Sequence, residues 1–247
     1  MKESVIAFDR VYKKYSLYHN ITGGIKHFLF HLPSALNSIK DSKYEALKDV
    51  SFEVCKGETF GIVGRNGAGK STILGLIAGV LKPSGGRVIL RGQTSALLEL
   101  GAGFHPELTG RENIMLNGVI LGLTKAKVLR KLDEIIEFAE IGEFINQPIR
   151  VYSNGMLARL GFAVVAHLDP DILLVDEILA VGDAEFQQKC LDKMMGFKKS
   201  GVTIIFVSHS MPDIIKICDR TLWLDNHTVR MLGESKEVAK QYARTVA

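Results

Sequence analysis

The sequence predicts an α/β protein with a mostly parallel sheet, helices covering that sheet, and a helical sub-lobe beside it. Two short and nearly continuous apolar runs, DILLVDE (171–177) and VTIIFVSH (202–209), are typical of strands buried on both faces of a parallel sheet. A helical pattern over 184–199 lies between them, which gives the strand–helix–strand order of such sheets. Residues from about 105 to 165 carry mainly helical patterns and predict the sub-lobe.

The N-terminal elements follow from alternation and glycine placement. Residues 5–15 and 44–54 alternate apolar and polar positions and predict edge or hairpin strands. Residues 59–64 (TFGIVG) predict a buried strand that leads into a glycine-rich loop and then into an apolar helix over 71–81. A further alternating strand is expected at 87–92, after a turn.

The sub-lobe and the C-terminal part show equally local signals. Thr109 and Glu112 form a capping-box pattern for one helix, and residues 125–141 predict a second, amphipathic helix. Residues 221–233 predict a hairpin with its turn at Asp225-Asn226. The last residues, 234–247, are expected to form a C-terminal helix or a linker.

Composition excludes several classes of protein. A hydrophobic content of 47% in 247 residues predicts one large globular domain, or one domain with a sub-lobe, and excludes disorder. A net charge of +4 and a pI near 8.9 fit acidic surfaces, lipid headgroups or nucleotides, but are too weak to argue for DNA binding. The three cysteines lack metal or redox spacing and are expected to be reduced thiols. Neither a signal peptide nor an apolar run long enough to span a bilayer is apparent, so we do not expect the chain to cross a membrane by itself.

Residues 64–71, GRNGAGKS, match the phosphate-binding pattern G-x-x-x-x-G-K-[ST] between a predicted strand and a predicted helix. Glycines let the backbone wrap around phosphates, whose charge is met by backbone N–H groups and the helix dipole. Lys70 is expected to reach the terminal phosphates, and Ser71 to place its hydroxyl on Mg²⁺. The full set of expected nucleotide contacts in this loop is Gly64, Arg65, Asn66, Gly67, Ala68, Gly69, Lys70, Ser71 and Thr72.

Carboxylates and a histidine end the two buried strands. Asp176 closes the run ILLVD at the carboxyl end of its strand, where ligands bind in open α/β sheets, and is a candidate Mg²⁺ partner. The adjacent Glu177 is a candidate for polarising an attacking water. A carboxyl pair of this kind can instead cap a helix, and without the glycine-rich loop that interpretation would be preferred. His209 ends the neighbouring strand and is a candidate for contacting a γ-phosphate or holding the water, although single histidines are more often structural.

The stretch RVYSNGMLARLGF (150–162) predicts a helix start. Ser153 is placed to cap the helix, because its hydroxyl can accept from the free N–H groups of the first turn. Such a start is also a ready site for an anion. Taken alone, the residues favour a plain capped helix.

The order of these features resembles that in the nucleotide-binding subunit of ABC transporters. The features are the glycine-rich loop, the sub-lobe, the capped helix, the Asp-Glu strand and the strand-end histidine. The resemblance implies a P-loop NTPase with an ABC ATPase core over 1–247, with an antiparallel β-subdomain and a helical subdomain. It also implies that two copies pair head to tail around two ATP molecules. In such a pair, Ser153 and Gly155 would contact the γ-phosphate held by the opposite copy. Asp183 matches the loop that communicates across the pair, and Tyr15 matches the aromatic residue that stacks on adenine.

Within that family, YSNGM (152–156) and DEILAVGD (176–183) resemble exporters of bacterial cell-surface polysaccharides of the O-antigen, capsule and teichoic-acid types. The implied cofactors are ATP and Mg²⁺, and ATP hydrolysis would drive passage of a lipid-linked glycan. The implied partners are a second copy and an integral-membrane permease, which would hold the subunit at the cytoplasmic face of the bacterial inner membrane. No nucleic-acid partner is expected.

Three features depart from the family pattern. The family carries a glutamine that touches Mg²⁺ before the sub-lobe, whereas here Glu99 is the nearest oxygen-bearing side chain. Asn154 stands where many relatives have glycine or serine, a change that keeps backbone N–H donation. The stretch 16–45 is longer than in compact members, and its apolar positions predict a basic amphipathic helix. That helix would contact either headgroups and the permease or its own domain.

Two other functions remain open from the sequence. A soluble ABC-type ATPase acting on ribosomes or DNA is the main alternative, although such proteins commonly carry two ATPase units or a long coiled-coil insertion. A small-molecule kinase built on the same loop would leave the Ser153 helix and His209 unexplained.

Overall fold

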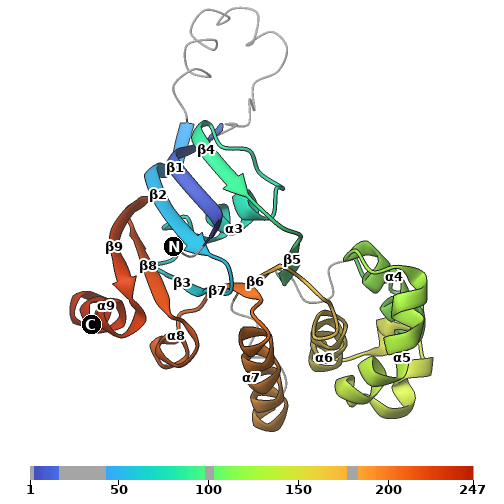
Figure 1. The fold of residues 1–247 in the computed structure, drawn as a ribbon. Coiled ribbons are helices and arrows are strands. Elements are labelled where there is room, and N and C mark those ends of the chain that lie inside the picture. Colours follow the sequence, from blue (N-terminus) through green and yellow to red (C-terminus); the bar gives the residue numbers. More distant parts are fainter. Residues whose placement is uncertain (1–2, 17–42, 98–102, 177–182, 247) are drawn as a thin grey trace, which may run out of the picture.

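A computed structural model describes residues 3–16, 43–97, 103–176 and 183–246 (Figure 1). The expectations for Glu99, for Glu177 and for the amphipathic helix within 16–45 therefore concern residues outside the described ones.

The central feature is a six-stranded sheet with the strand order β5-β6-β7-β3-β8-β9. The first five strands of this order run parallel, and β8 and β9 form an antiparallel hairpin at one edge. This arrangement confirms the mostly parallel sheet. The bounds are β3 Thr59–Val63, β5 Thr94–Leu97, β6 Ile172–Asp176, β7 Thr203–Val207, β8 Arg220–Asp225 and β9 Thr228–Glu234.

A second, three-stranded antiparallel sheet covers one face of the first and has the order β2-β1-β4. Its strands are β1 Ser4–Ser16, β2 Lys43–Cys55 and β4 Gly85–Leu90. The long pairing of β1 with β2 confirms the expected hairpin strands and places Tyr15 opposite Tyr44.

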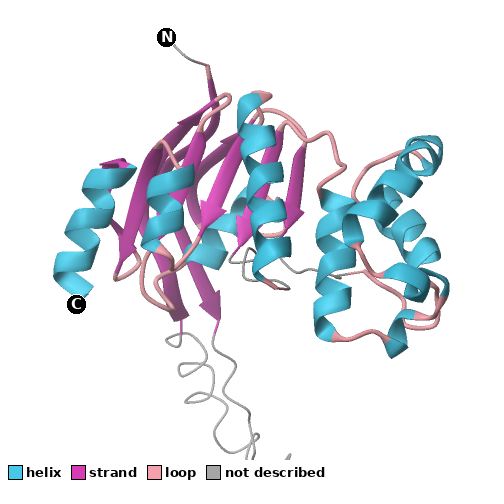
Figure 2. Cartoon of the chain, turned by 90° about the horizontal axis from the view of Figure 1, so that it is seen from below, coloured by secondary structure: helices cyan, strands magenta, loops and turns pink. Residues whose placement is uncertain are grey.

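The helix α3 (Lys70–Ile77) lies between the two sheets, while α7 (Ala184–Lys199) and α8 (Met211–Ile217) lie on the other face of the large sheet (Figures 1 and 2). Alternate residues of the parallel strands therefore enter two different cores. Ile172 and Leu174 pack with α3 and the antiparallel sheet, whereas Leu173 and Val175 pack with α6 and α7. Burial on both faces explains why these strands are continuously apolar.

The helical part contains α4 (Gly110–Ile120), α5 (Lys125–Ala139), the 3₁₀ turns Gly142–Asn146 and Ile149–Val151, and α6 (Asn154–Val165), all set to one side of the sheets (Figure 2). The capping box is present, since the Thr109 hydroxyl accepts from the Glu112 N–H and the Glu112 carboxylate accepts from the Thr109 N–H. The chain closes with α9 (Ser235–Val246), which packs on β8, β9 and α8.

Several elements differ from the sequence-based expectation: β4 begins two residues before the expected 87 and ends at Leu90, α5 ends at Ala139 rather than 141, and β5 was not predicted. The end of α3 and the last hairpin show the physical reasons most clearly. The helix α3 ends at Ile77 rather than at residue 81. Gly79 adopts a φ of 74°, and the Leu81 N–H returns to the Gly75 carbonyl, which closes the helix in a left-handed glycine cap. The last hairpin turns at Asn226 and His227, both with positive φ, and not at Asp225-Asn226. Asp225 remains in the ladder opposite Thr228, so the two-residue turn is shifted by one position.

The cysteines carry free thiols, as expected, and Cys190 and Cys218 are buried. Burial raises the pKa of Cys190 to about 12, so this thiol is unreactive at neutral pH. Among the described residues, none of the helices combines the length and the apolarity that a membrane crossing requires.

Candidate functional site

The glycine-rich loop runs from the end of β3 to the start of α3, as its sequence predicts. A Cβ atom on Gly64 would lie 2.4 Å from the carbonyl oxygen of Leu224, and one on Gly69 would lie 2.5 Å from that of Ala46. Gly67 has open space around it but a φ of 79°. The first two glycines are thus required by close backbone approach, and Gly67 by its left-handed conformation.

Lys70 closes the loop on itself. Its Nζ donates to the carbonyl oxygens of Gly64 at 2.9 Å and of Arg65 at 3.2 Å. The residue is buried, and this desolvation lowers the pKa of Lys70, while the charge of Asp176 opposes the shift. The loop therefore holds a desolvated cation beside backbone N–H groups at a helix start, an arrangement suited to phosphate.

Asp176 and His209 reach the same pocket from neighbouring strands. Asp176 ends β6 opposite Val207, and His209 follows two residues after that partner. Burial raises the pKa of Asp176, and the Lys70 charge opposes it. Burial, followed by the Lys70 charge, lowers the pKa of His209, which favours its neutral form at pH 7. The expected meeting of the two strand ends is confirmed.

The resulting phosphate pocket has a volume of about 410 Å³. It is lined by Tyr44, Ala46, Asn66, Gly67, Gly69, Lys70, Ser71, Thr72, Asp176 and His209. The Ser71 hydroxyl and the Asp176 carboxylate are oxygen donors of the kind that Mg²⁺ prefers. Within the described residues, no group of three or more His, Cys, Asp or Glu side chains is placed to hold a metal ion. The donor set therefore fits a Mg²⁺ ion held mainly through nucleotide phosphates.

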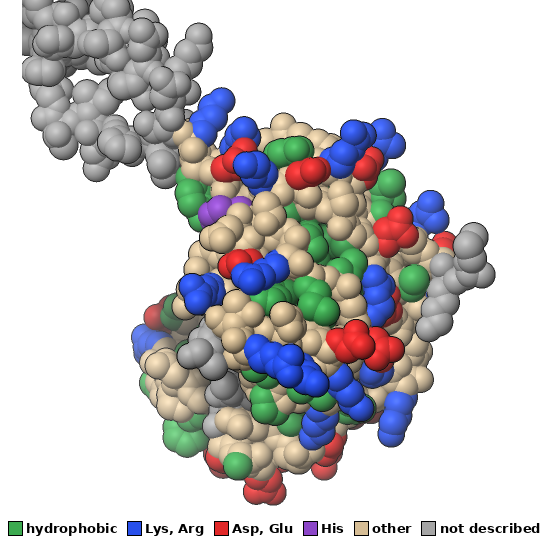
Figure 3. Space-filling view, turned by 90° about the vertical axis from the view of Figure 1, so that its left-hand side faces the viewer, with side chains coloured by type: hydrophobic (Ala, Val, Ile, Leu, Met, Phe, Trp, Pro, Cys, Tyr) green, Lys and Arg blue, Asp and Glu red, His purple; other side chains and the backbone are tan. Residues whose placement is uncertain are grey.

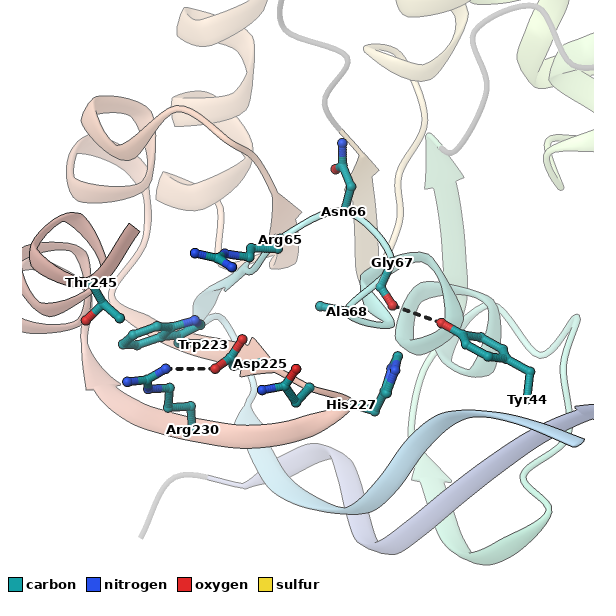
Figure 4. A pocket seen from close by; sticks show the side chains of 11 residues that line it. Tyr44, Arg65, Asn66, Gly67, Ala68, Trp223, Asp225, His227, Arg230 and Thr245 are labelled. Carbon is teal, nitrogen blue, oxygen red and sulfur yellow. Dashed lines mark hydrogen bonds and ion pairs between the residues drawn. The ribbon is translucent and has the colours of Figure 1, made fainter. Parts of the chain in front are cut away.

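A second cavity of about 540 Å³ adjoins the loop (Figure 4). Arg65 and Ala68 line this cavity rather than the phosphate pocket, while Asn66 and Gly67 line both. Its other wall comes from the β8–β9 hairpin, where Arg230 pairs with Asp225 at 2.7 Å and lies over the Trp223 ring. Arg65 and Ala68 thus lie where the loop borders this second cavity.

An aromatic residue that the sequence did not single out lines the phosphate pocket. The Tyr44 hydroxyl donates to the Gly67 carbonyl at 3.1 Å, and the ring is 40% exposed (Figure 4). Tyr15, the expected adenine partner, lies across the strand pair; its hydroxyl is 3.4 Å from that of Thr72, and the Lys13 ammonium lies over its ring. The alternating pattern of 44–54 marked Tyr44 as a strand residue, but only the pairing with β1 brings it to the loop.

Ser153 caps α6 as expected, because its Oγ accepts from the Met156 N–H at 3.2 Å. Asn154 is the first residue of the helix, and Gly155 follows it. A Cβ atom on Gly155 would meet only the Ser153 hydroxyl, at 3.8 Å. Neither Ser153 nor Gly155 lines the phosphate pocket of its own chain. Their helix belongs to the helical part, apart from α3 (Figure 1).

Asp183 caps α7, with one carboxylate oxygen accepting from the Phe186 N–H at 3.0 Å. This hydrogen bond is the main reason for its lowered pKa. The other oxygen accepts from Arg159 of α6 at 2.7 Å. Arg159 was not identified from the sequence, although it is the single charged residue in the otherwise apolar or uncharged helix α6.

Comparisons with known proteins agree with this geometry. Residues 47–180 match the family model for ABC transporters. The chain is 54% identical over 245 residues to the O-antigen export system ATP-binding protein RfbB of Klebsiella pneumoniae, covering 99% of this chain and 100% of that protein. It is 46% identical over 241 residues to the teichoic acids export ATP-binding protein TagH of Listeria innocua, covering 98% of this chain and 70% of that protein.

The fold also matches a solved structure. A dimeric ATP-binding cassette in a post-hydrolysis state, bound to ADP and Pi, superimposes with a TM-score of 0.73 at 21% identity, over 93% of this chain and 98% of that chain. This likeness confirms the fold class. Together with the family model and the relatives, it establishes that the chain belongs to the ABC transporter family and is an ATPase with the fold predicted for its nucleotide-binding subunits.

Proposed function

We propose that this protein is the ATP-hydrolysing subunit that powers export of a lipid-linked polysaccharide of the O-antigen type. The observation that carries the proposal is the similarity to RfbB along the whole of both chains. The chain is also similar to TagH, whose name assigns it to teichoic acid export, and this similarity supports export of a polymer. The chain acts as one nucleotide-binding domain, with residues of about 105–165 as its helical subdomain.

Within one chain, the phosphate pocket binds the triphosphate of ATP. The loop from Gly64 to Thr72 surrounds the phosphates with backbone N–H groups, and Lys70 supplies the charge near their terminal end. Ser71 and Asp176 would hold Mg²⁺, which when bound would neutralise phosphate charge. Glu177, which directly follows β6, orients and polarises the attacking water, and His209 contacts the γ-phosphate from the next strand.

A second copy completes the site. Ser153 and Gly155 present a helix start, capped but still rich in N–H donors, that has no phosphate in its own chain to bind. In a head-to-tail pair, this helix start meets the γ-phosphate bound by the opposite copy. Tyr15 supports the adenine, and the Asp183 region lies between the two sites. Two ATP molecules thus hold the pair together until hydrolysis.

The subunit works at the cytoplasmic face of the bacterial inner membrane through an integral-membrane permease. No nucleic acid is involved. The face that carries β9 and α9 supports this point, since its basic and acidic side chains are interspersed instead of forming one basic surface (Figure 3). Residues 16–45 are expected to contact the permease or lipid headgroups. Glu99 stands in the sequence near the place of the family's glutamine, where a contact with Mg²⁺ is expected.

The decisive experiment combines one variant with one purification. Glu177→Gln is expected to bind ATP, to hydrolyse it at a small fraction of the wild-type rate, and to form a dimer that depends on ATP. Wild-type hydrolysis by this variant would refute the role of Glu177. Affinity purification from membranes should recover a permease, whereas stable association with ribosomes or DNA and no permease would contradict the export function.

A further inference from the structure

We propose that Arg159 is a positioning residue that aligns the Ser153 end of α6 with the start of α7. This inference rests on the proposed function, because it concerns how the helix start that meets the opposite copy's γ-phosphate is held in place.

The contacts of Arg159 join three elements at one point. Its guanidinium donates to Asp183 at the start of α7 at 2.7 Å and to Glu140 at the end of α5 at 3.3 Å. The same group lies 4.7 Å from the ring centroid of Phe186 in the first turn of α7. A planar guanidinium presents its N–H donors in a fixed fork, so it can bond two carboxylates while its face lies on a ring, with a more defined orientation than the rotatable ammonium of lysine gives.

Glu140, the second carboxylate of the junction, has an unusual backbone conformation and two cationic partners. It ends α5 with φ 52° and ψ 43°, a left-handed conformation that residues other than glycine rarely adopt. Its carboxylate receives both Arg159 and Lys189, and Lys189 also donates to the Phe138 carbonyl at 3.2 Å. Four alternating charges, Asp183, Arg159, Glu140 and Lys189, thus link α5, α6 and α7.

The Arg159 side chain is only 18% exposed, which reduces the screening of these pairs by water. Beneath them, the rings of Phe138, Phe162 and Phe186 contact one another with centroids about 6 Å apart. The charged junction therefore lies over an aromatic core shared by the same three helices. The partner side chains Asp183 and Glu140 are themselves 63% and 46% exposed, so water screens these pairs in part, and the packing of the guanidinium over the aromatic core adds to the orientation that the pairs give.

Position along the helix explains what Arg159 aligns. It lies six residues after Ser153, or roughly 9 Å along the α6 axis. α7 follows the strand that ends in Asp176, separated from it by residues 177–183. Holding α6 against the start of α7 thus sets the helix start that serves the opposite copy relative to Asp183 and α7. Asp183 acts in this junction through its side chain, by capping α7 and holding Arg159.

The test uses the full chain carrying Glu177→Gln, in which ATP-dependent dimerisation is followed by sedimentation velocity. Adding Arg159→Gln is expected to raise the ATP concentration for half-maximal dimerisation about tenfold or more, as the loss of a charged hydrogen bond predicts. Binding of a fluorescent ATP analogue to dilute monomer should stay within about twofold. In the otherwise wild-type chain, the same change should lower kcat with little change in monomer affinity.

Arg150→Gln is the matched control, because it removes another arginine of the helical part, paired with Glu107 at 2.8 Å, without touching α7. Combining Arg159→Gln with Asp183→Asn should weaken dimerisation by less than the sum of the two single losses, because the two changes share one link and asparagine can still cap α7. If Arg159→Gln fails to fold, Arg159→Lys replaces it, and a severalfold weaker dimerisation is expected from the lost fork geometry.

Dimerisation and turnover equal to those of the Arg150→Gln control would overturn the positioning role while leaving the proposed function intact. Additive losses in the double variant would overturn the link between Arg159 and Asp183. If the Glu177→Gln parent itself forms no dimer with ATP, the proposed function fails, and the inference fails with it.

Discussion

Lys70 and Asp176 line one pocket, and each opposes the pKa shift that burial imposes on the other. Burial lowers the pKa of Lys70 and raises the pKa of Asp176, while the charge of each residue favours the charged form of its neighbour. Desolvation is the larger effect for both residues. Without a ligand, the fold thus holds two charges whose desolvation is only partly offset by their mutual attraction. Bound phosphate and Mg²⁺ would add the opposite charges that each group lacks.

Asp176→Asn is expected to separate stability from function. A raised carboxyl pKa means that the ionised form is disfavoured in the folded chain, so a neutral isostere should keep or slightly raise the free energy of unfolding at pH 7. The same change removes the proposed Mg²⁺ ligand and should lower ATPase turnover by at least about 100-fold. Urea unfolding without nucleotide and steady-state turnover measure the two effects. A clear loss of stability would contradict this account of the pocket.

Lys70→Ala should abolish tight ATP binding while leaving the fold intact. The change deletes a desolvated cation that is placed for the terminal phosphates, and each charged hydrogen bond contributes about 1.5–3 kcal/mol. The dissociation constant for ATP, measured by calorimetry, should rise at least about tenfold. Lys198→Ala is the control. Lys198 forms an ion pair with Asp219 at 2.7 Å, and neither residue lines the pocket. That variant should lose some stability and retain its nucleotide affinity.

Gly69→Ala and Gly67→Ala should differ in stability. A methyl group at Gly69 would lie 2.5 Å from the Ala46 carbonyl oxygen, and alanine there would also have to adopt a φ of 112°. At Gly67 the methyl group would meet no atom, and only the φ of 79° disfavours alanine. We expect Gly69→Ala to cost several kcal/mol and Gly67→Ala about 1–2 kcal/mol, by the usual cost of left-handed backbone and of forced contacts. Thermal unfolding without nucleotide measures both, and equal losses would refute the steric argument.

His167 should make the protein less stable in acid. Burial lowers its pKa, its Nδ1 lies 2.7 Å from the Ala163 carbonyl, and the facing charges are Lys193, Glu134 and Lys131. Because the folded pKa lies below the unfolded one, the unfolded chain binds more protons in the window between them. The free energy of unfolding therefore falls as the pH drops below about 6.5, by at most about 1.4 kcal/mol per pH unit for this one group.

The comparison of wild type with His167→Gln isolates that contribution. The difference between their unfolding free energies should be constant above pH 7.5 and should change in favour of the variant as the pH falls to 5.5. A difference that does not vary with pH would show that His167 has no share in acid destabilisation. The lowered pKa of His209 contributes equally to both proteins and cancels in the comparison.

Sequence by itself determined the elements whose formation depends on local chemistry. The buried strands around Leu173 and Ile205 were recognisable because both faces of a parallel sheet must be apolar. The phosphate loop was recognisable from the spacing of its glycines, lysine and serine between a strand and a helix, and the Ser153 cap because it satisfies a backbone N–H group within three residues of itself. Asp176 was recognisable because the carboxyl end of a parallel strand is where ligands bind.

Only the tertiary structure decided which distant residues meet. Tyr44 reaches the loop through the strand pairing of β1 with β2, Gly64 is dictated by the Leu224 carbonyl of another strand, and Arg159 joins Asp183 across two helices. These contacts depend on strand register and helix packing, which are set by the summed burial of two cores and not by any local pattern. For the same physical reason, the sequence identified the groups proposed to bind phosphate, and the fold decided which distant residues hold them in place.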